Sequence, residues 1–319
     1  MAILGSIILA TYNRSAFLAE AIESALAQGP EFEVIVVDDG STDDTPRIIE
    51  RYPAVRSVKT ENRGPAAARN LGLTMASGSY VRFHDSDDRI PFGALSKLLE
   101  TAKTLGEEQV AIGDAILIDE RGDPGKGPTY GFAAIVPPGA IPPSVLLSNV
   151  MATPLPLFPK SALQEFGGFD ENLTISEDYE LAIRLAANGV SFVRVPIIVC
   201  EVREHEGGRA SRGYGAPGYQ QQLKALVQSW ARWEQRQGAN NEDRAAIGRM
   251  AWSLGRSASR ESFRAEADAL FAFANAVGGL SARPAPWIVQ VLSMVLSPYH
   301  AERLLEAMKS ARKRTARTQ

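Results

Sequence analysis

The sequence contains very little cysteine, and it lacks the segments that would carry a chain into or across a membrane. Cys200 is the one cysteine among 319 residues, so no disulfide can form within the chain, which fits a reducing compartment. No basic stretch precedes the apolar residues 2–10, as a secretory signal would require. The apolar run over residues 287–296 is too short to cross a bilayer. We therefore expect a cytoplasmic protein, at most peripheral at the inner face of the membrane.

An excess of basic charge and the two common phosphate-binding motifs are also missing. The formal net charge is −3, which gives no overall attraction to nucleic acid, and we expect no such partner. No G-x-G-x-x-G follows the first apolar segment, and no G-x-x-x-x-G-K-[ST] occurs, which argues against ordinary dinucleotide-binding and P-loop proteins. The content of 45% hydrophobic and 22% charged residues is typical of a globular protein.

The first two thirds of the chain alternate between strand-like and helix-like segments, and this alternation predicts an α/β layer with a mostly parallel sheet. The predicted strands are residues 3–10, 33–37, 55–59, 79–83 and 109–118. The predicted helices between them are residues 16–27, 42–52, 65–75 and 91–103. Residues 121–159 are rich in proline and glycine and predict an irregular, partly ordered insertion near a binding face. A helix over 176–188 and a strand pair around Pro196, at 191–195 and 197–202, follow.

The last third is predicted to be a separate helical domain. The Gly-rich residues 207–218 indicate a linker or lid between a domain over 1–206 and a domain over 219–319. The predicted helices are residues 219–237, 242–256, 261–277, 285–296 and 298–312. The basic residues of the tail are Lys309, Arg312, Lys313, Arg314 and Arg317. This region has three open interpretations: completion of an acceptor site, oligomerisation, or peripheral contact with an anionic membrane. The sequence does not predict an oligomeric state.

Acidic residues follow two of the predicted strands. Asp38 and Asp39 end one strand, and the turn Asp85–Asp88 follows another. Ligands of open α/β sheets bind beyond the carboxyl ends of the strands, so we expect both clusters to face one crevice. Neighbouring carboxylates repel each other unless a cation lies among them, and Mg²⁺ or Mn²⁺ prefers such oxygen ligands together with substrate phosphates. Taken alone, either cluster has a second interpretation, a solvated acidic turn or a set of helix caps.

Several motifs occur in a fixed order and point to one family. They are SIILATYNR (6–14), VIVVDDGSTD (34–43), ENRGPAAARN (61–70), DSDD (85–88), GGFDE (167–171), Glu177–Asp178, and Arg203–His205 with Ser211 nearby. This order resembles the inverting family 2 glycosyltransferases of the GT-A fold, over about residues 3–205. Two departures are His84, where the family usually has an apolar residue, and the loose spacing after Arg203. The resemblance implies a GT-A-type nucleotide-sugar-binding domain, here followed by a C-terminal α-helical region.

The resemblance also implies how the donor would be bound. Thr11 and Tyr12 would line the pocket of the base, Asp39 would accept a hydrogen bond from the base, and Arg69 would face the donor. The base implied is uracil, so the donor would be a UDP-sugar. Asp87 would contact the donor through a divalent cation, Mn²⁺ or Mg²⁺, that bridges the diphosphate.

The remaining roles concern the metal and the acceptor. Asp85 or Asp88 would complete the metal site with Asp87, and His205 is a further candidate ligand. Asp178 would be the general base, in the first turn of a helix capped by Ser176 and anchored by Leu181 and Leu185. The acceptor region would contain Gly168, Phe169 and Glu177. Two of these features also have purely structural interpretations, since Asp178 suits a helix N-terminus and the Gly-Gly pair suits a bend.

The function predicted is an inverting transfer of a sugar from a nucleoside-diphosphate sugar to a hydroxyl group. The acceptor could be a glycan, a lipid-linked sugar or a protein. Two alternatives are a nucleotidyltransferase, which also uses a metal and carboxylates on an α/β sheet, and a catalytically silent sugar-nucleotide-binding or assembly module. The nucleotidyltransferase would need a Gly-rich triphosphate loop, and residues 10–14 contain no glycine.

Overall fold

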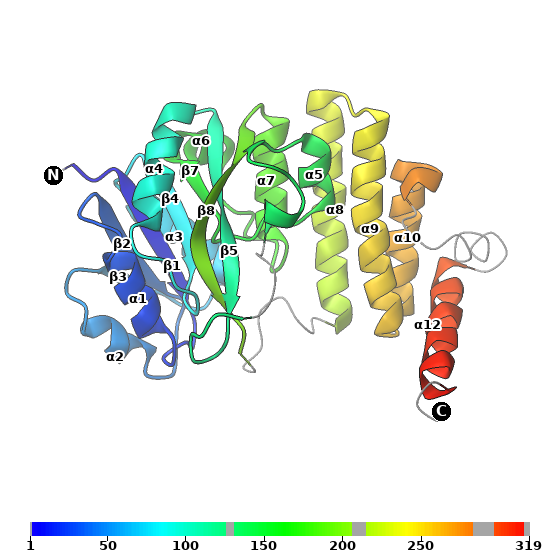
Figure 1. Ribbon diagram of the computed structural model, residues 1–319, viewed down its shortest axis with the longest axis horizontal. Helices are drawn as coiled ribbons and strands as arrows, with labels where there is room; N and C mark the ends of the chain where they lie inside the picture. Colours follow the sequence, from blue (N-terminus) through cyan, green and yellow to red (C-terminus); the bar gives the residue numbers. More distant parts are fainter. Residues whose placement is uncertain (1, 126–130, 206–214, 283–296, 316–319) are drawn as a thin grey trace. The chain divides into compact units, whose positions relative to one another are not determined.

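The computed structural model describes residues 2–125, 131–205, 215–282 and 297–315. The chain divides into two compact units (Figure 1). The first unit comprises residues 1–141 and 151–209, and the second comprises residues 142–150 and 210–319.

The first unit is an α/β layer built on one mixed sheet. Its strands are β1 (Gly5–Thr11), β2 (Phe32–Asp38), β3 (Arg56–Lys59), β4 (Tyr80–Asp85), β5 (Gln109–Ile118), β6 (Gly139–Ala140), β7 (Pro156–Pro159) and β8 (Ser191–Arg203). Its helices are α1 (Leu18–Leu26), α2 (Thr45–Glu50), α3 (Pro65–Met75), α4 (Ala94–Leu105), the 3₁₀ helix η1 (Phe132–Ala134), α6 (Lys160–Phe166) and α7 (Glu177–Ala187). The eight strands lie in the order β3-β2-β1-β4-β7-β5-β8-β6. The predicted α/β class with a mostly parallel sheet is confirmed.

The parallel strands β1, β2 and β4 form the part of the sheet that carries the acidic motifs. Their central residues are buried, as expected for strands covered on both faces. They are apolar in β1 and β2, whereas β4 also buries Arg82 and His84. β2 and β4 flank β1, and the register pairs Ala10 with Asp85 and Thr11 with Asp38. The two acidic clusters therefore end on either side of the last residues of β1, at the carboxyl edge of the sheet.

The prediction of an irregular region over residues 121–159 is wrong for several of its residues. The segment contains β6, β7 and the helix α5 (Pro143–Ser148). β7 lies between β4 and β5 and pairs antiparallel with both. It is only four residues long and has a proline at each end, so it lacks the length and alternation by which a strand is recognised. Its four residues are all buried, so tertiary packing decides their conformation.

The predicted strand pair around Pro196 is also wrong. β8 is one continuous strand, and both of its halves pair parallel with β5. The register shifts between Ile112 and Asp114, whose partners are Arg194 and Ile198, so Pro196 lies within the irregularity. Proline has no N–H to donate to a ladder, and a bulge accommodates it without ending the strand.

The second unit consists of helices. They are α5, α8 (Gly215–Gln237), α9 (Asn241–Arg260), α10 (Arg264–Gly278), the 3₁₀ helix η2 (Gly279–Ala282) and α12 (Pro298–Thr315). Trp230, Trp233 and Trp252 are buried and belong to the core of this unit. Asn240 caps α9 in a capping box, and Trp233 Nε1 donates to Asp243 Oδ2 at 3.1 Å, which ties α8 to α9.

Some predictions for this region concern residues that lie outside the described ranges. Residues 215–218 of the predicted linker form the first turn of α8, while 207–214 lie outside the described residues. The predicted helix 285–296, with the apolar run from residue 287, lies outside them too, as does Arg317. No helix within the described ranges is long and apolar enough to span a membrane.

Candidate functional site

A cleft of about 230 Å³ opens at the carboxyl end of β1 and the N-terminus of α3. It is lined by Ala10, Thr11, Tyr12, Asp39, Asn62, Gly64, Pro65, Ala68 and Arg69. Four of the five predicted donor-binding residues thus lie around one cavity. Tyr12 is partly exposed, whereas Thr11, Asp39 and Arg69 are buried. The cleft combines an aromatic ring, a carboxylate and a guanidinium group, a combination suited to a nucleotide.

Asp39 organises the wall of this cleft. Its backbone N–H donates to Thr11 O at 2.9 Å. Its Oδ1 accepts from the N–H of Arg63 and its Oδ2 from the N–H of Gly64, both at 2.9 Å. Gly64 precedes α3 with φ +93°, a conformation that favours glycine. Asp39 therefore fixes the start of α3, a structural role that the sequence did not predict, and its carboxylate keeps further lone pairs for a ligand.

Arg69 connects the cleft to two acidic elements. Its Nη1 donates to Glu177 Oε1 at 2.6 Å and its Nη2 to Asp85 Oδ1 at 3.2 Å. The guanidinium also lies over the ring of Phe169, 5.2 Å from the ring centroid. Burial opposes the charge of Arg69, but the Glu177 and Asp85 carboxylates outweigh it and hold the pKa of Arg69 above its ordinary value. The side chain is thus a fixed cation at the cleft.

Asp178 lies in the first turn of α7 and has an unusual acidity. Burial, together with the negative charge of Glu177, raises the pKa of Asp178 to about 7, against the hydrogen bond from the Tyr179 N–H. Leu181 and Leu185 of the same helix are buried, as predicted. The predicted capping by Ser176 is wrong, because this residue has φ +60° and its side chain makes no capping hydrogen bond. A carboxylate that titrates near neutral pH suits general base catalysis.

The acidic turn uses its three carboxylates differently. Asp85 Oδ1 pairs with Arg69. Asp87 Oδ2 lies 3.1 Å from His205 Nε2 and 3.5 Å from Arg14 Nε. Asp88 is buried, and its Oδ1 accepts from the Arg203 N–H. The structure therefore brings His205 to the turn, whereas Asp88 is directed into the protein.

Two side chains at the acidic turn have the chemistry to hold a divalent cation. Within the described ranges, no group of three or more His, Cys, Asp or Glu side chains is gathered closely enough to hold a metal ion. Asp87 and His205 nevertheless bring an oxygen and an imidazole nitrogen together, and Mn²⁺ accepts both. A cation bound through one or two protein ligands takes its other ligands from phosphates and water. Asp87 and His205 fit such a site, and Asp88 does not.

The residues predicted for the acceptor region belong to the packed part of the unit. Phe169 is buried against Phe83, with ring centroids 4.8 Å apart. Its N–H donates to Asn70 Oδ1 at 2.8 Å, and its carbonyl accepts from Asn70 Nδ2 at 2.9 Å. A Cβ on Gly168 would meet Asn70 Oδ1, which the Phe169 N–H holds in place, so this position favours glycine. Glu177, the third residue, is paired with Arg69.

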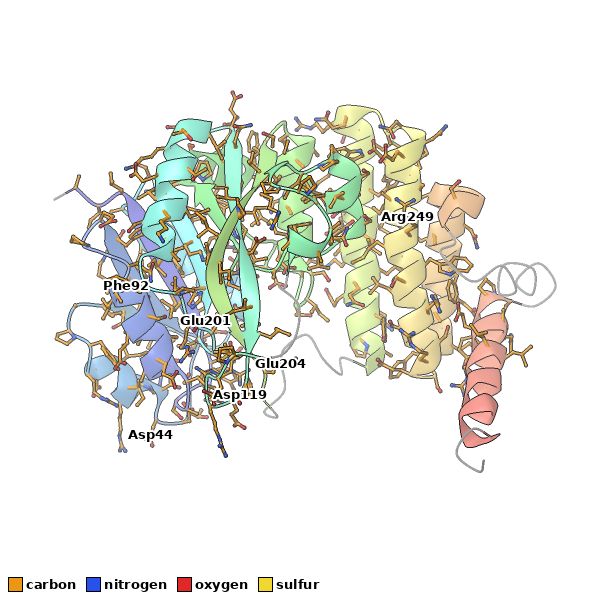
Figure 2. The ribbon with its side chains drawn as sticks, viewed as in Figure 1. Asp44, Phe92, Asp119, Glu201, Glu204 and Arg249 are labelled. Atoms are coloured by element: carbon orange, nitrogen blue, oxygen red, sulfur yellow. The ribbon has the colours of Figure 1, made fainter. Side chains whose placement is uncertain are left out.

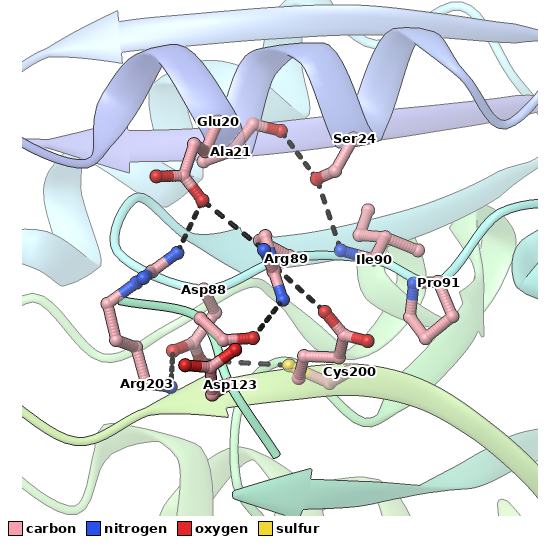
Figure 3. A network of polar contacts seen from close by, with 12 residues as sticks. Glu20, Ala21, Ser24, Asp88, Arg89, Ile90, Pro91, Asp123, Cys200 and Arg203 are labelled. Atoms are coloured by element: carbon pink, nitrogen blue, oxygen red, sulfur yellow. Dashed lines mark hydrogen bonds and ion pairs between the residues drawn. The ribbon is translucent and has the colours of Figure 1, made fainter. Parts of the chain in front are cut away.

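Several residues near the turn were not assigned from the sequence. Arg14 belongs to the first motif, but its pairing with Asp87 depends on the fold. Arg203 is buried and bonds to Glu20 of α1 (Figure 3). His84, which departs from the family pattern, is buried, and its Nε2 lies 3.2 Å from Asp88 O. Burial and the nearby Arg82 charge lower the pKa of His84 to about 3, so the ring is neutral.

Known proteins share both sequence and fold with this chain. Residues 6–127 match the model of glycosyl transferase family 2. The succinoglycan biosynthesis protein ExoO of Rhizobium meliloti is 35% identical over 195 residues, which are 57% of this chain and 56% of ExoO. The poly(ribitol-phosphate) β-N-acetylglucosaminyltransferase TarS of Staphylococcus aureus is 30% identical over 66% of this chain and 38% of TarS. The chain thus spans about half or less of these relatives.

Solved structures extend the likeness in the fold. The S. aureus TarS 1–349 in complex with UDP-GlcNAc superposes with a TM-score of 0.67 and 22% identity, over 86% of this chain and 81% of that chain. The mannosyltransferase PcManGT of Pyrobaculum calidifontis, in complex with GDP-Man and Mn²⁺, gives a TM-score of 0.56 and 23% identity, over 96% and 85%.

The sheet order, the cleft at its carboxyl edge and these superpositions define a GT-A fold. The match of residues 6–127 to the model of glycosyl transferase family 2 agrees with this fold.

Proposed function

We propose that this chain transfers a sugar from a nucleoside-diphosphate sugar to a hydroxyl group of an acceptor, with inversion at the anomeric carbon. The observation that carries the proposal is the arrangement of the first unit, in which Arg69 lines the cleft and also bonds to Asp85 of the acidic turn and to Glu177, the neighbour of Asp178. A nucleotide in the cleft would therefore lie beside both the candidate metal turn and the candidate base.

The donor is proposed to be a UDP-sugar. Asp39 offers an acceptor for a base N–H, and Tyr12 offers a ring face for stacking. TarS in complex with UDP-GlcNAc supports uracil, whereas PcManGT in complex with GDP-Man supports the wider class of nucleoside-diphosphate sugars. The identity of the sugar is left to experiment.

The proposed chemistry divides between the two sides of the scissile bond. On the acceptor side, Asp178 takes the proton of the attacking hydroxyl, and its pKa of about 7 makes it a stronger base than an exposed aspartate. On the donor side, the cations Arg69 and Arg14 lie next to the acidic turn, where the diphosphate would carry its charge. A single displacement needs one base and no protein nucleophile, which accounts for inversion.

A divalent cation, Mn²⁺ or Mg²⁺, is part of the proposal. Asp87 would hold it, with His205 and Asp85 as the neighbouring candidates, and the diphosphate would supply the other ligands. When bound, the cation acts as a Lewis acid that stabilises the negative charge of the departing nucleoside diphosphate. The complex of PcManGT with Mn²⁺ supports this part of the proposal.

The acceptor is proposed to be a glycan. The names of ExoO and TarS, which refer to succinoglycan biosynthesis and to a poly(ribitol-phosphate) acceptor, support a polymeric acceptor over a protein. A lipid-linked sugar has the same hydroxyl chemistry and is to be tested beside it. The match of residues 6–127 to the model of glycosyl transferase family 2 makes the nucleotidyltransferase alternative the weaker one.

The test is a thermal-shift and calorimetry panel of UDP- and GDP-sugars with and without Mn²⁺. A ligand at 100 times its Kd stabilises the protein by about 2.7 kcal/mol, a shift that is readily measured. We expect metal-dependent binding of a UDP-sugar, followed by donor hydrolysis or transfer in a nucleoside-diphosphate release assay. Binding without any turnover, with a range of glycan acceptors, would favour the silent binding module. Absence of binding by every donor would contradict the proposal.

A further inference from the structure

Asp88 has surroundings that differ from those of a metal ligand. Its side chain is only 5% exposed. Oδ1 accepts from the backbone N–H of Arg203 at 2.8 Å, and Oδ2 lies 3.7 Å from Cys200 Sγ. Burial and then the charge of Asp88 raise the pKa of the Cys200 thiol, so the thiol stays protonated and donates. Both oxygens of Asp88 are thus directed towards β8.

Arg203 bonds to the same turn in the opposite direction. Its Nε donates to the carbonyl of Asp87 at 3.0 Å, and its Nη1 to the carbonyl of Glu120 at 2.8 Å. Its Nη2 donates to Glu20 Oε2 at 2.7 Å, as Figure 3 shows. The side chain is 1% exposed. Asp88 and Arg203 therefore form a reciprocal clamp between the acidic turn and the end of β8, and α1 supports it through Glu20.

The clamp fixes the backbone that leads into His205. Only one residue separates Arg203 from His205, and that residue, Glu204, donates its N–H to Ile118 O at 2.8 Å. Figure 2 labels Glu204 beside Asp119, where β5 and β8 finish side by side. The guanidinium of Arg203 lies over Phe17, 5.1 Å from the ring centroid, and the ring of Phe17 lies 4.8 Å from that of His205.

We infer that Asp88 is a positioning residue, which together with Arg203 holds His205 against Asp87, and that it does not ligate the cation. The part of the inference that concerns the cation rests on the proposed function, whereas the part that concerns the position of His205 does not depend on it. If Asp88 turned to bind a metal, the buried N–H of Arg203 would lose its acceptor, and such unsatisfied groups are strongly disfavoured. The sequence grouped Asp88 with Asp85 and Asp87, and the structure separates it from them.

The experiment compares Asp88→Asn with Asp88→Ala and Asp87→Asn. Asparagine keeps an oxygen for the Arg203 N–H but removes the carboxylate. A positioning role predicts that Asp88→Asn rescues Mn²⁺ affinity, measured by calorimetry in the presence of UDP, to the level of the parent. Asp88→Ala should weaken that affinity by about 10–100-fold, the usual effect of losing a group that orients a metal ligand. Asp87→Asn should abolish it.

A second readout needs no ligand. The chain has three histidines, so the imidazole NMR signals of His205 can be assigned with a His205→Gln variant. Asp88→Ala should shift these signals, and Asp88→Asn should leave them near their parent positions, with thermal unfolding confirming that both variants are folded. An Asp88→Asn variant that loses Mn²⁺ as Asp87→Asn does would overturn the inference, as would an Asp88→Ala variant with parental His205 signals. Failure of the parent to bind Mn²⁺ and UDP would instead contradict the proposed function.

Discussion

Arg69 Nη1 and Glu177 Oε1 lie 2.6 Å apart, although the two residues are 108 positions apart in the sequence. Both side chains are buried, so the pair joins α3, which lines the cleft, to α7, which carries Asp178. Removing one partner of a buried ion pair destabilises a protein by about 3–5 kcal/mol, because the other charge stays buried. The pair thus couples the donor cleft to the candidate base through one rigid contact, and it limits which substitutions can test either site.

Asp87 is the residue through which we expect metal dependence. Asp87→Ala removes the carboxylate that His205 and Arg14 approach, so Mn²⁺-dependent donor binding should be lost. Binding of UDP without metal should persist, because the cleft is unchanged. Calorimetry with donor, with and without Mn²⁺, measures both. Glu204→Gln is a matched control near the turn, and it should behave as the parent does. Unchanged donor affinity and metal response in Asp87→Ala would remove Asp87 from the site.

Asp39 is expected to have two separable effects. Asp39→Ala removes acceptors from the N–H groups of Arg63 and Gly64, so it should lower both stability and nucleotide affinity. Asp39→Asn retains one acceptor oxygen and should disturb the fold less, yet it presents a donor N–H₂ in place of the second oxygen. A hydrogen bond to a charged group contributes about 1.5–3 kcal/mol, which calorimetry with UDP resolves. If Asp39→Asn binds UDP with the affinity of the parent, Asp39 has only the structural role of holding the N–H groups of Arg63 and Gly64.

The α/β layer could be predicted from the sequence because β1 and β2 are nearly continuous apolar strands, and because acidic residues follow β2 and β4. β7 could not, since four residues between two prolines carry no periodic signal and depend on the neighbouring strands. The motifs also identified four of the nine residues that line the cleft, Thr11, Tyr12, Asp39 and Arg69. They could not distinguish Asp88 from Asp87, because the difference lies in a backbone N–H that the fold supplies from Arg203.

The C-terminal region carries the prediction of peripheral membrane contact. The apolar run 287–296 lies outside the described residues, and the basic tail begins in α12. This prediction therefore rests on the sequence. Basic residues near a surface of anionic lipid contribute about 1 kcal/mol each. The chain should float with anionic liposomes, and a chain cut after Ala307 should float less. Equal flotation of the two chains, or none by either, would contradict this interpretation.

The pKa of Asp178 sets the expected pH dependence of transfer. A general base acts in its ionised form, so with a pKa of about 7 the rate should rise as the pH increases through about 7 and level off above it. After burial, the charge of Glu177 is the largest cause of the raised pKa, so Glu177→Gln should move this limb to lower pH. Glu171→Gln is the control, since Glu171 is exposed and pairs with Arg63. If the rise of the rate with pH occurs at the same pH in Glu177→Gln as in the parent, the pH dependence does not arise from Asp178.

The base itself is tested by Asp178→Asn. The substitution keeps the size of the side chain and removes the proton acceptor, while Leu181 and Leu185 continue to anchor α7. Asp178 does not line the cleft, so donor and Mn²⁺ should bind almost as in the parent. Transfer to a hydroxyl should fall by about 10²–10⁴-fold, the usual contribution of general base catalysis. Single-turnover assays, with donor affinity measured in parallel, separate the two effects.

Glu177→Gln is the matched variant for this test. The amide oxygen that this substitution introduces would still accept a hydrogen bond from Arg69, and Asp85 would still pair with that guanidinium. Glu177→Gln should therefore retain most of the transfer rate at a pH above the pKa of Asp178, where Asp178 is ionised in both proteins. The opposite pattern, in which Asp178→Asn transfers sugar at close to the parental rate and Glu177→Gln is inactive, would assign the base to Glu177. Loss of donor binding in Asp178→Asn would show instead that Asp178 helps to hold the donor.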